Sequence, residues 1–179
     1  AAEILAYDRD VTASVSLSGY AVPMKMMCET ASDYCGPAAY LGAPFVLLHQ
    51  WVLFGSAANG SAVDAVNGCA VPILIVQGLA DTTVRPDGAA LSAQREKLTN
   101  PKVEILLLEG EDHMSLLRPH TQEYTDYVAQ INRDYAALYD TYGGEIPQDV
   151  RAEFYAGVDK SITGGVWREL MQRIDVFYR

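Results

Sequence analysis

The feature that most constrains the fold is a pair of short, almost purely apolar runs, residues 71–77 (VPILIVQ) and 103–108 (VEILLL). The first run is apolar at successive positions, which is typical of a strand buried on both faces between layers of helices. The segment between the runs, 88–99 (GAALSAQREKLT), is predicted as a helix with Asp87 as its N-cap and a stop before Pro101. Strand, helix and strand with short connections predict an α/β fold, with a parallel sheet flanked by helices.

The other elements are predicted from turn residues and helical periodicity. Residues 13–19 (ASVSLSG) are expected to form a further short strand, and residues 20–37 an irregular segment. Residues 37–55 are predicted as an apolar helix, or a helix pair broken near Pro44. Residues 1–8 are predicted as the end of a helix, and a short helix with a capping-box-like start is predicted from Ser61 to Gly68. A long tyrosine-edged helix is predicted from beyond Pro119 to Gly143, and a shorter one after Pro147. A last helix at 166–179 should pack on the sheet.

Composition limits the classes of partner. The 179 residues suffice for one domain with a sizeable core, and the net charge of −10 argues against nucleic acid, whose binding depends on Lys and Arg. The longest apolar runs are shorter than the roughly 20 residues of a membrane helix, so no membrane partner is expected.

The three cysteines, Cys28, Cys35 and Cys69, show no CxxC spacing and form no metal ligand set with the three histidines. Free thiols in a reducing, cytoplasmic compartment are expected, with a Cys28–Cys35 disulfide as the alternative. The sequence also carries no cofactor motif.

Two residues with catalytic chemistry follow the two apolar runs. Gly78 ends the first run and Asp81 comes three residues later, while Gly110 ends the second and His113 comes three residues later. The carboxyl ends of parallel strands meet at one edge of the sheet, so the two side chains are predicted to come within hydrogen-bonding distance. A carboxylate in this position fixes the imidazole tautomer, and the imidazole can then activate a nucleophile.

These segments together resemble the C-terminal half of an α/β-hydrolase, in the serine esterase, lipase and aminopeptidase branch. VPILIVQGLADTTV looks like the segment that supplies the triad acid, and VEILLLEGEDHMSLL like the one that supplies the base, which implies those roles for Asp81 and His113. ASVSLSGYAVP resembles the strand that follows the nucleophile helix. The resemblance covers residues 1 to about 117 and the last helix, and implies one partial hydrolase domain over 1–179.

The triad serine of such enzymes lies in a G-x-S-x-G elbow, and none of the 14 glycines here is followed two residues later by serine. The resemblance places residues 1–7 (AAEILAY) in the helix that the elbow opens, so the serine is expected just upstream of Ala1. The chain alone is therefore expected to be inactive. Because three strands are few for so many helices, a separate N-terminal segment or a swapped copy is expected to complete the sheet.

In this family the region before the acid strand commonly carries a cap, so residues 20–70 include a candidate cap. Met26, Tyr40 and Trp51 are candidates for substrate contact there, or else these side chains simply pack the helices onto the sheet. Residues 118–164 are a helical insertion that departs from the family pattern.

The leading hypothesis for function is cleavage of a carboxylic ester. The alternatives are a peptidase acting on short peptides, with Glu29 or Asp33 available for a substrate amine, and a non-catalytic hydrolase-fold binding protein.

Overall fold

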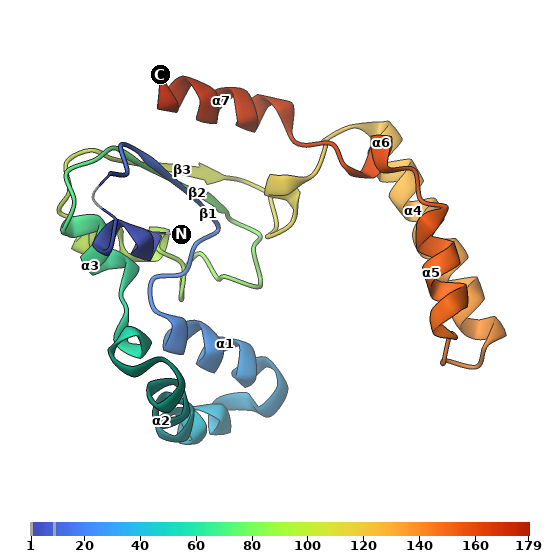
Figure 1. Ribbon diagram of the computed structural model, residues 1–179, viewed down its shortest axis with the longest axis horizontal. Helices are drawn as coiled ribbons and strands as arrows, with labels where there is room; N and C mark the ends of the chain where they lie inside the picture. Colours follow the sequence, from blue (N-terminus) through green and yellow to red (C-terminus); the bar gives the residue numbers. More distant parts are fainter. Residues whose placement is uncertain (1, 9) are drawn as a thin grey trace. The chain divides into compact units, whose positions relative to one another are not determined.

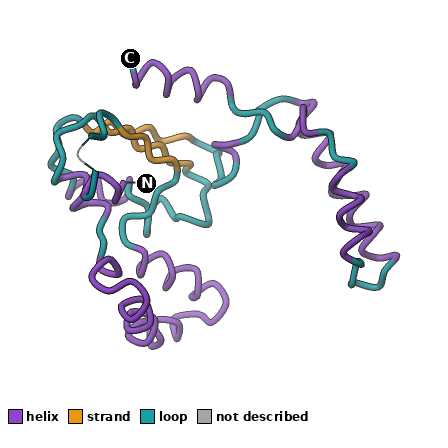
Figure 2. The backbone as a smooth tube through the Cα atoms, viewed as in Figure 1, coloured by secondary structure: helices purple, strands orange, loops and turns teal. Residues whose placement is uncertain are grey.

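The computed structural model describes residues 2–8 and 10–179, and the chain divides into two compact units. The first contains the described residues up to Leu116 together with Ile174–Arg179, and the second is Leu117–Arg173. Figure 1 labels the elements of both units, and Figure 2 distinguishes their helices, strands and loops. Each unit is described below by itself.

The described part of the first unit contains a three-stranded parallel sheet in the order β1-β2-β3. The strands are β1 (Ser14–Leu17), β2 (Ile73–Gly78) and β3 (Val103–Leu108), and β2 pairs with both neighbours. All three predicted strands are therefore present, and the two that carry Asp81 and His113 are adjacent. The chain belongs to the α/β class, as the two apolar runs predict.

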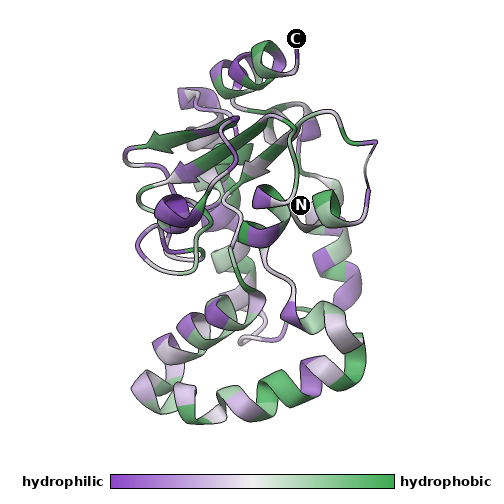
Figure 3. Ribbon diagram, turned by 90° about the vertical axis from the view of Figure 1, so that its left-hand side faces the viewer, coloured by the Kyte–Doolittle hydropathy of each residue, from purple (hydrophilic) through white to green (hydrophobic). Residues whose placement is uncertain are grey.

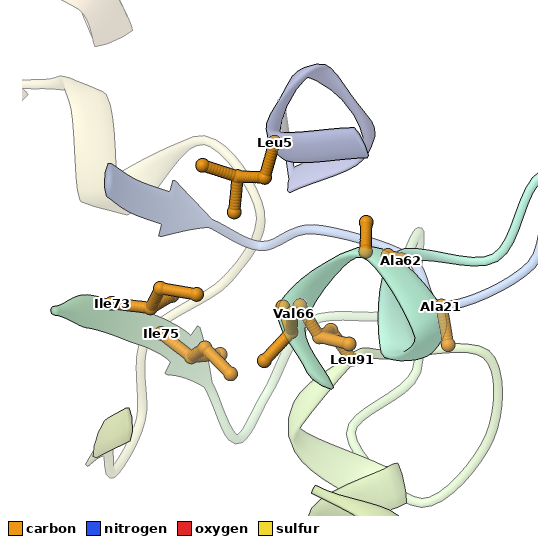
Figure 4. Close-up of a cluster of buried hydrophobic side chains, with 8 residues drawn as sticks. Leu5, Ala21, Ala62, Val66, Ile73, Ile75 and Leu91 are labelled. Carbon is orange, nitrogen blue, oxygen red and sulfur yellow. The ribbon is translucent and has the colours of Figure 1, made fainter. Parts of the chain in front are cut away.

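The core is centred on β2, whose six residues are all buried. On one face, Ile73 and Ile75 point towards Val66 of α3 (Ala62–Asn67) and towards Leu91 (Figure 4). On the other face, Leu74 is only 1% exposed. Burying one such aliphatic side chain stabilises the fold by about 1.5–3 kcal/mol. The prediction of a strand covered on both faces is confirmed.

Among the described residues, β1 and β3 each pair with a strand on one side only. β3 is less well covered than β2, and its Leu107 is 41% exposed. An unpaired edge presents free backbone N–H and C=O groups that favour pairing with another strand. Within residues 2–8 and 10–179, both outer edges of the sheet are therefore unpaired.

The prediction that residues 20–37 are irregular is wrong, because α1 is a helix spanning Pro23–Cys35. Pro23 lies in the first turn, where its missing N–H is no loss and its fixed φ suits a helix. The helix ends at Gly36, whose φ of 61° lies in the left-handed region that favours glycine. Pro23 therefore starts a helix in a segment expected to be irregular.

The segment after α1 follows the predicted pattern more closely. A 3₁₀ segment η2 (Gly36–Gly42) precedes α2 (Ala43–Phe54), so the predicted break falls at the start of α2, next to Pro44. A second 3₁₀ segment, η3 (Gly55–Asn59), leads to α3, which Ser61 caps by accepting a hydrogen bond from the Asp64 backbone N–H at 3.2 Å.

The predicted helix at 88–99 is also wrong, since only a 3₁₀ segment, η4 (Ser92–Lys97), forms there. The backbone groups that a helix would need are bonded elsewhere. The N–H of Ala89 donates to Glu29 Oε2 at 2.9 Å, and the N–H of Leu91 donates to the carbonyl of Gly19 at 2.8 Å. These long-range bonds replace the intrahelical ones, so Asp87 does not cap a helix.

At the N-terminus, a 3₁₀ segment η1 (Ala2–Ala6) stands where a helix end was expected. The last helix, α7 (Arg168–Tyr178), forms as predicted, but it crosses the boundary between the units. Its predicted packing on the sheet stays a prediction.

The second unit is helical, as predicted for the insertion at 118–164. Helix α4 (Gln122–Thr141) is capped by Thr121 and followed by Gly143, and α5 (Gln148–Ala156) follows Pro147. The Tyr135 ring packs edge-on against Phe154, with 5.3 Å between the ring centroids. A short helix that the sequence analysis did not predict, α6 (Lys160–Thr163), begins at Asp159, whose carboxylate accepts a hydrogen bond from the Ser161 N–H.

One helical stretch, Pro23–Asn67, is long and apolar enough to cross a membrane by length and composition alone, with a mean hydropathy of 1.3. It is not one straight helix, because it contains breaks at Gly36 and Gly55. Its longest regular helix, α1, has 13 residues and a length of about 20 Å, which is less than the ~30 Å hydrocarbon core of a bilayer. The stretch is weak evidence for a membrane span.

Candidate functional site

Asp81 lies in the loop directly after β2 and is only 2% exposed. Its Oδ1 accepts hydrogen bonds from the backbone N–H groups of Thr83 at 2.9 Å and Val84 at 2.8 Å. These bonds fold the loop back over the carboxylate, as an aspartate at the start of a turn commonly does. The loop therefore fixes Oδ1 and leaves Oδ2 for another donor.

That donor is His113, in the loop after β3. Its Nδ1 lies 2.9 Å from Asp81 Oδ2, so the contact predicted from the sequence is present. An ionised carboxylate only accepts hydrogen bonds, so Nδ1 carries the proton and donates it, which leaves Nε2 as the nitrogen for a nucleophile. The side chain of His113 is 35% exposed while that of Asp81 is fully buried, so the pair opens to solvent on the imidazole side.

Close packing of the two loops holds this pair together. The N–H of Ala80 donates to the Glu111 carbonyl at 2.9 Å. A Cβ added at Gly78 would lie 2.2 Å from that same carbonyl oxygen, which is far inside contact distance. Glycine is therefore required at position 78 by the packing, because only a residue without a side chain lets the acid and base loops come into contact.

The pKa of Asp81 lies below its ordinary value of 3.8. Burial by itself raises the pKa. The backbone hydrogen bond from Val84, the hydrogen bond from His113 and a polar contact with Ser18 together lower the pKa by more than burial raises it. Ser18 Oγ acts on the carboxylate although it makes no hydrogen bond of regular geometry. Asp81 is accordingly a stable anion at neutral pH and a suitable partner for an imidazolium.

The side chain of a further residue, Gln77, contacts the carboxylate and was not among the predicted site residues. Gln77, the fifth residue of β2, is completely buried, and its Nε2 lies 3.2 Å from Asp81 Oδ2. A signal was available in the sequence, because glutamine is the only polar side chain in that apolar run. A buried amide requires hydrogen-bond partners, and those partners belong to the site.

A hollow of about 800 Å³ adjoins Asp81 and opens between the acid loop and α1. An ion pair between Arg85 of the loop and Asp33 of α1 lies at its rim. The carboxylate of Glu29 accepts the Ala89 N–H, and Lys25 Nζ donates to the Gly88 carbonyl at 2.8 Å, so α1 is linked to the acid loop at three points. The residues that line the hollow are Asp33, Leu79, Ala80, Asp81, Thr82, Arg85, Pro86 and Asp87.

The three predicted substrate-contacting residues lie elsewhere in the candidate cap. Met26 is on α1, Tyr40 on η2 and Trp51 on α2, and none of them lines the hollow beside Asp81. Tyr40 and Trp51 are 52% and 56% exposed. Their role in binding a substrate stays a prediction.

The serines nearest to the pair do not have the arrangement of a nucleophile. Ser18 ends β1 in a left-handed conformation, with a φ of 44°, but it is 5% exposed and close to Asp81 rather than bonded to the imidazole. The hydroxyl of Ser115, two residues after His113, donates to the Asp112 carbonyl at 2.9 Å. The strain at Ser18 is nevertheless typical of functional sites.

The part of the chain that the structure describes contains no cluster of three His, Cys, Asp or Glu side chains placed to hold a metal ion. Comparison with protein-family models, with curated proteins and with solved structures finds no match.

Proposed function

We propose that this chain supplies the acid and the base of a serine hydrolase of the α/β-hydrolase fold that cleaves a carboxylic ester. The observation that carries the proposal is the hydrogen bond between Asp81 Oδ2 and His113 Nδ1 at the carboxyl edge of a parallel sheet. In this role Asp81 orients the ring, and Nε2 takes the proton of a serine hydroxyl and then returns it to the leaving group. No cofactor is required.

The nucleophile in this proposal is a serine outside residues 1–179, which is brought to the edge of the sheet by a segment or copy that pairs with it. The two open edges of the sheet support this part of the proposal. The oxyanion donors would come with the same segment, because one of them is the backbone N–H that follows the nucleophile.

A fluorophosphonate probe, which reacts with an activated serine, tests the proposal on the full-length protein. We expect labelling of the wild type and of the control variant His49→Ala, since His49 is exposed on α2, and loss of labelling in His113→Ala. Asp81→Asn should lower the labelling rate by a factor on the order of 10⁴, as loss of a triad acid does in other serine hydrolases. Labelling that survives the loss of His113 would contradict the proposed base.

A second candidate, a peptidase acting on short peptides, is favoured by the charges around the hollow beside Asp81. Asp33 and Asp87 line it together with Arg85, so a free substrate amine would meet an excess of negative charge there. Comparing the hydrolysis of an amino-acid ester with that of its N-acetyl derivative separates the two candidates, because only a peptidase of this kind should require the free amine.

A further inference from the structure

Gln77 is a polar residue in the most deeply buried strand of the molecule. It is 0% exposed, and its neighbours along β2 are Val76 and Gly78. An amide buried without partners costs about 1–3 kcal/mol on the scale of protein mutational data, so a glutamine here requires specific hydrogen bonds.

The amide of Gln77 meets three acceptors on its nitrogen side. Nε2 lies 3.2 Å from Asp81 Oδ2, 3.1 Å from the Val84 carbonyl and 3.1 Å from the Gly78 carbonyl. Because all three are acceptors, only the NH₂ group can face them, and the orientation of the amide is determined by its surroundings. The amide thus joins the strand, the carboxylate and the end of the acid loop.

We propose that Gln77 is a positioning residue, which holds the Asp81 carboxylate in the orientation in which Oδ2 accepts the hydrogen bond from His113. This inference rests on the proposed function and adds a residue to its acid–base pair. Gln77 donates to the carbonyl of Val84, and the N–H of Val84 donates to Asp81 Oδ1. One amide therefore restricts both the conformation of the loop and the orientation of the carboxylate. Val84 is itself only 1% exposed, which keeps water from competing for these bonds.

Two further atoms next to the pair support a functional role for this network. Gln77 Oε1 is buried without a hydrogen-bond partner among the described residues, and the buried Ser18 Oγ has none of regular geometry, although Ser18 helps to lower the pKa of Asp81. Such exceptions are rare in a core and call for an explanation. The titratable and charged groups in the vicinity are His113, which contacts the carboxylate directly, and Arg85, Asp33 and Asp87, which line the adjoining hollow.

The experiment compares Gln77→Met with the control Gln94→Met, because Gln94 is a partly buried glutamine that contacts the Gly88 carbonyl and lies outside the network. NMR follows the titration of the Asp81 carboxyl carbon and the exchange of the His113 Nδ1–H with water. In Gln77→Met we expect the pKa of Asp81 to rise from its lowered value, and the Nδ1–H to exchange about tenfold faster, as the loss of a hydrogen bond to a charged group implies. The control should match the wild type in both.

A folded Gln77→Met with an unchanged Asp81 titration and unchanged Nδ1–H exchange would overturn the proposal. If that variant does not fold, Gln77→Glu decides, since it keeps the shape of the side chain. Two carboxylates at this distance share one proton, so the Asp81 titration should move to higher pH, and an unmoved titration would again overturn the proposal.

These readouts do not require catalysis, so they separate the positioning role from the proposed function. A shifted Asp81 titration in a protein whose serines are not labelled by a fluorophosphonate supports the role of Gln77 and contradicts the hydrolase. Labelling that depends on His113, together with an Asp81 titration that is the same in the Gln77 variants and in the wild type, supports the hydrolase and contradicts the positioning role.

Discussion

Strand β2 and helix α2 both have strongly apolar sequences, yet every residue of β2 is buried and none of α2 is. Figure 3 shows the hydrophobic colouring of α2. A helix that is apolar around its whole circumference normally lies inside a protein or a membrane. The difference shows that hydrophobicity determines what needs a partner, while the fold of this chain determines which element receives one.

The exposed side chains of α2 are large and numerous, and they carry no charge. Residues 34–63 contain no Asp, Glu, Lys or Arg, in a chain whose net charge is −10. An exposed patch of this kind is typical of an interaction surface. Its most exposed large side chains include Phe45, Leu48, Trp51, Val52, Leu53 and Phe54.

The largest expected effect comes from removing atoms in β2. Ile75→Ala should lower the free energy of unfolding by about 3–4 kcal/mol, because Ile75 is 0% exposed and its loss leaves a cavity against α3. Leu48→Ala in α2 should change it by less than about 0.5 kcal/mol, since Leu48 is 60% exposed. Urea unfolding followed by circular dichroism measures both. A large loss in Leu48→Ala would mean that α2 is covered in solution.

The second comparison uses one added methyl group. Gly78→Ala should cost about 3 kcal/mol, because the new Cβ would meet the Glu111 carbonyl oxygen at 2.2 Å and push the acid and base loops apart. Gly42→Ala, at the start of α2, meets nothing within 4 Å and should be neutral or slightly stabilising. The melting temperatures of the two variants test this, and a Gly78→Ala as stable as the wild type would contradict the packing of the two loops.

The third comparison concerns the pH dependence of the buried pair. The pKa of Asp81 is lowered in the folded state, so its contribution to stability is present above 3.8 and is lost as the pH falls through the folded value. Asp81→Asn should therefore be less stable than the wild type at neutral pH, by about 1–2 kcal/mol, and the gap should narrow towards acid pH. Unfolding curves recorded over a range of pH measure this, and a gap that widens in acid would contradict the direction of the shift.

What the sequence could predict reflects how local each signal is. The apolar runs at 71–77 and 103–108 carry their own periodicity, so the strands, their parallel pairing and the contact between Asp81 and His113 follow from them. The segment after Asp87 does not form the helix its composition favours, because its backbone bonds to Glu29, 60 residues away. A hydrogen bond between residues so far apart in the sequence cannot be predicted from the local pattern of residue types.

The same limit applies to the site itself. The contact between Asp81 and His113 could be predicted from their positions after glycine, but the contact of Gln77 with Asp81 depends on how the loop folds back towards the strand. The start of α1 was missed for a different reason, since proline favours a helix only at its first turn, and the sequence alone does not show which turn contains Pro23.

The smallest expected effects distinguish two of the links between α1 and the acid loop, those made by Glu29 and by Asp33. Glu29→Gln should cost about 1 kcal/mol, because the residue is only 9% exposed and its carboxylate accepts the Ala89 N–H, which a neutral amide oxygen binds less strongly. Asp33→Asn should cost less than about 0.5 kcal/mol, since its ion pair with Arg85 is solvent-exposed and screened by salt. Chemical unfolding at low and high salt separates the two, because the Asp33 variant should lose its difference from the wild type at high salt. The Glu29 variant also loses a long ion pair with Lys25, at 3.8 Å, but should keep most of its difference, which comes from the buried hydrogen bond. Equal costs at both positions would mean that burial does not set the strength of these ties, and that the helix next to Asp81 is held by charge rather than by its buried hydrogen bond.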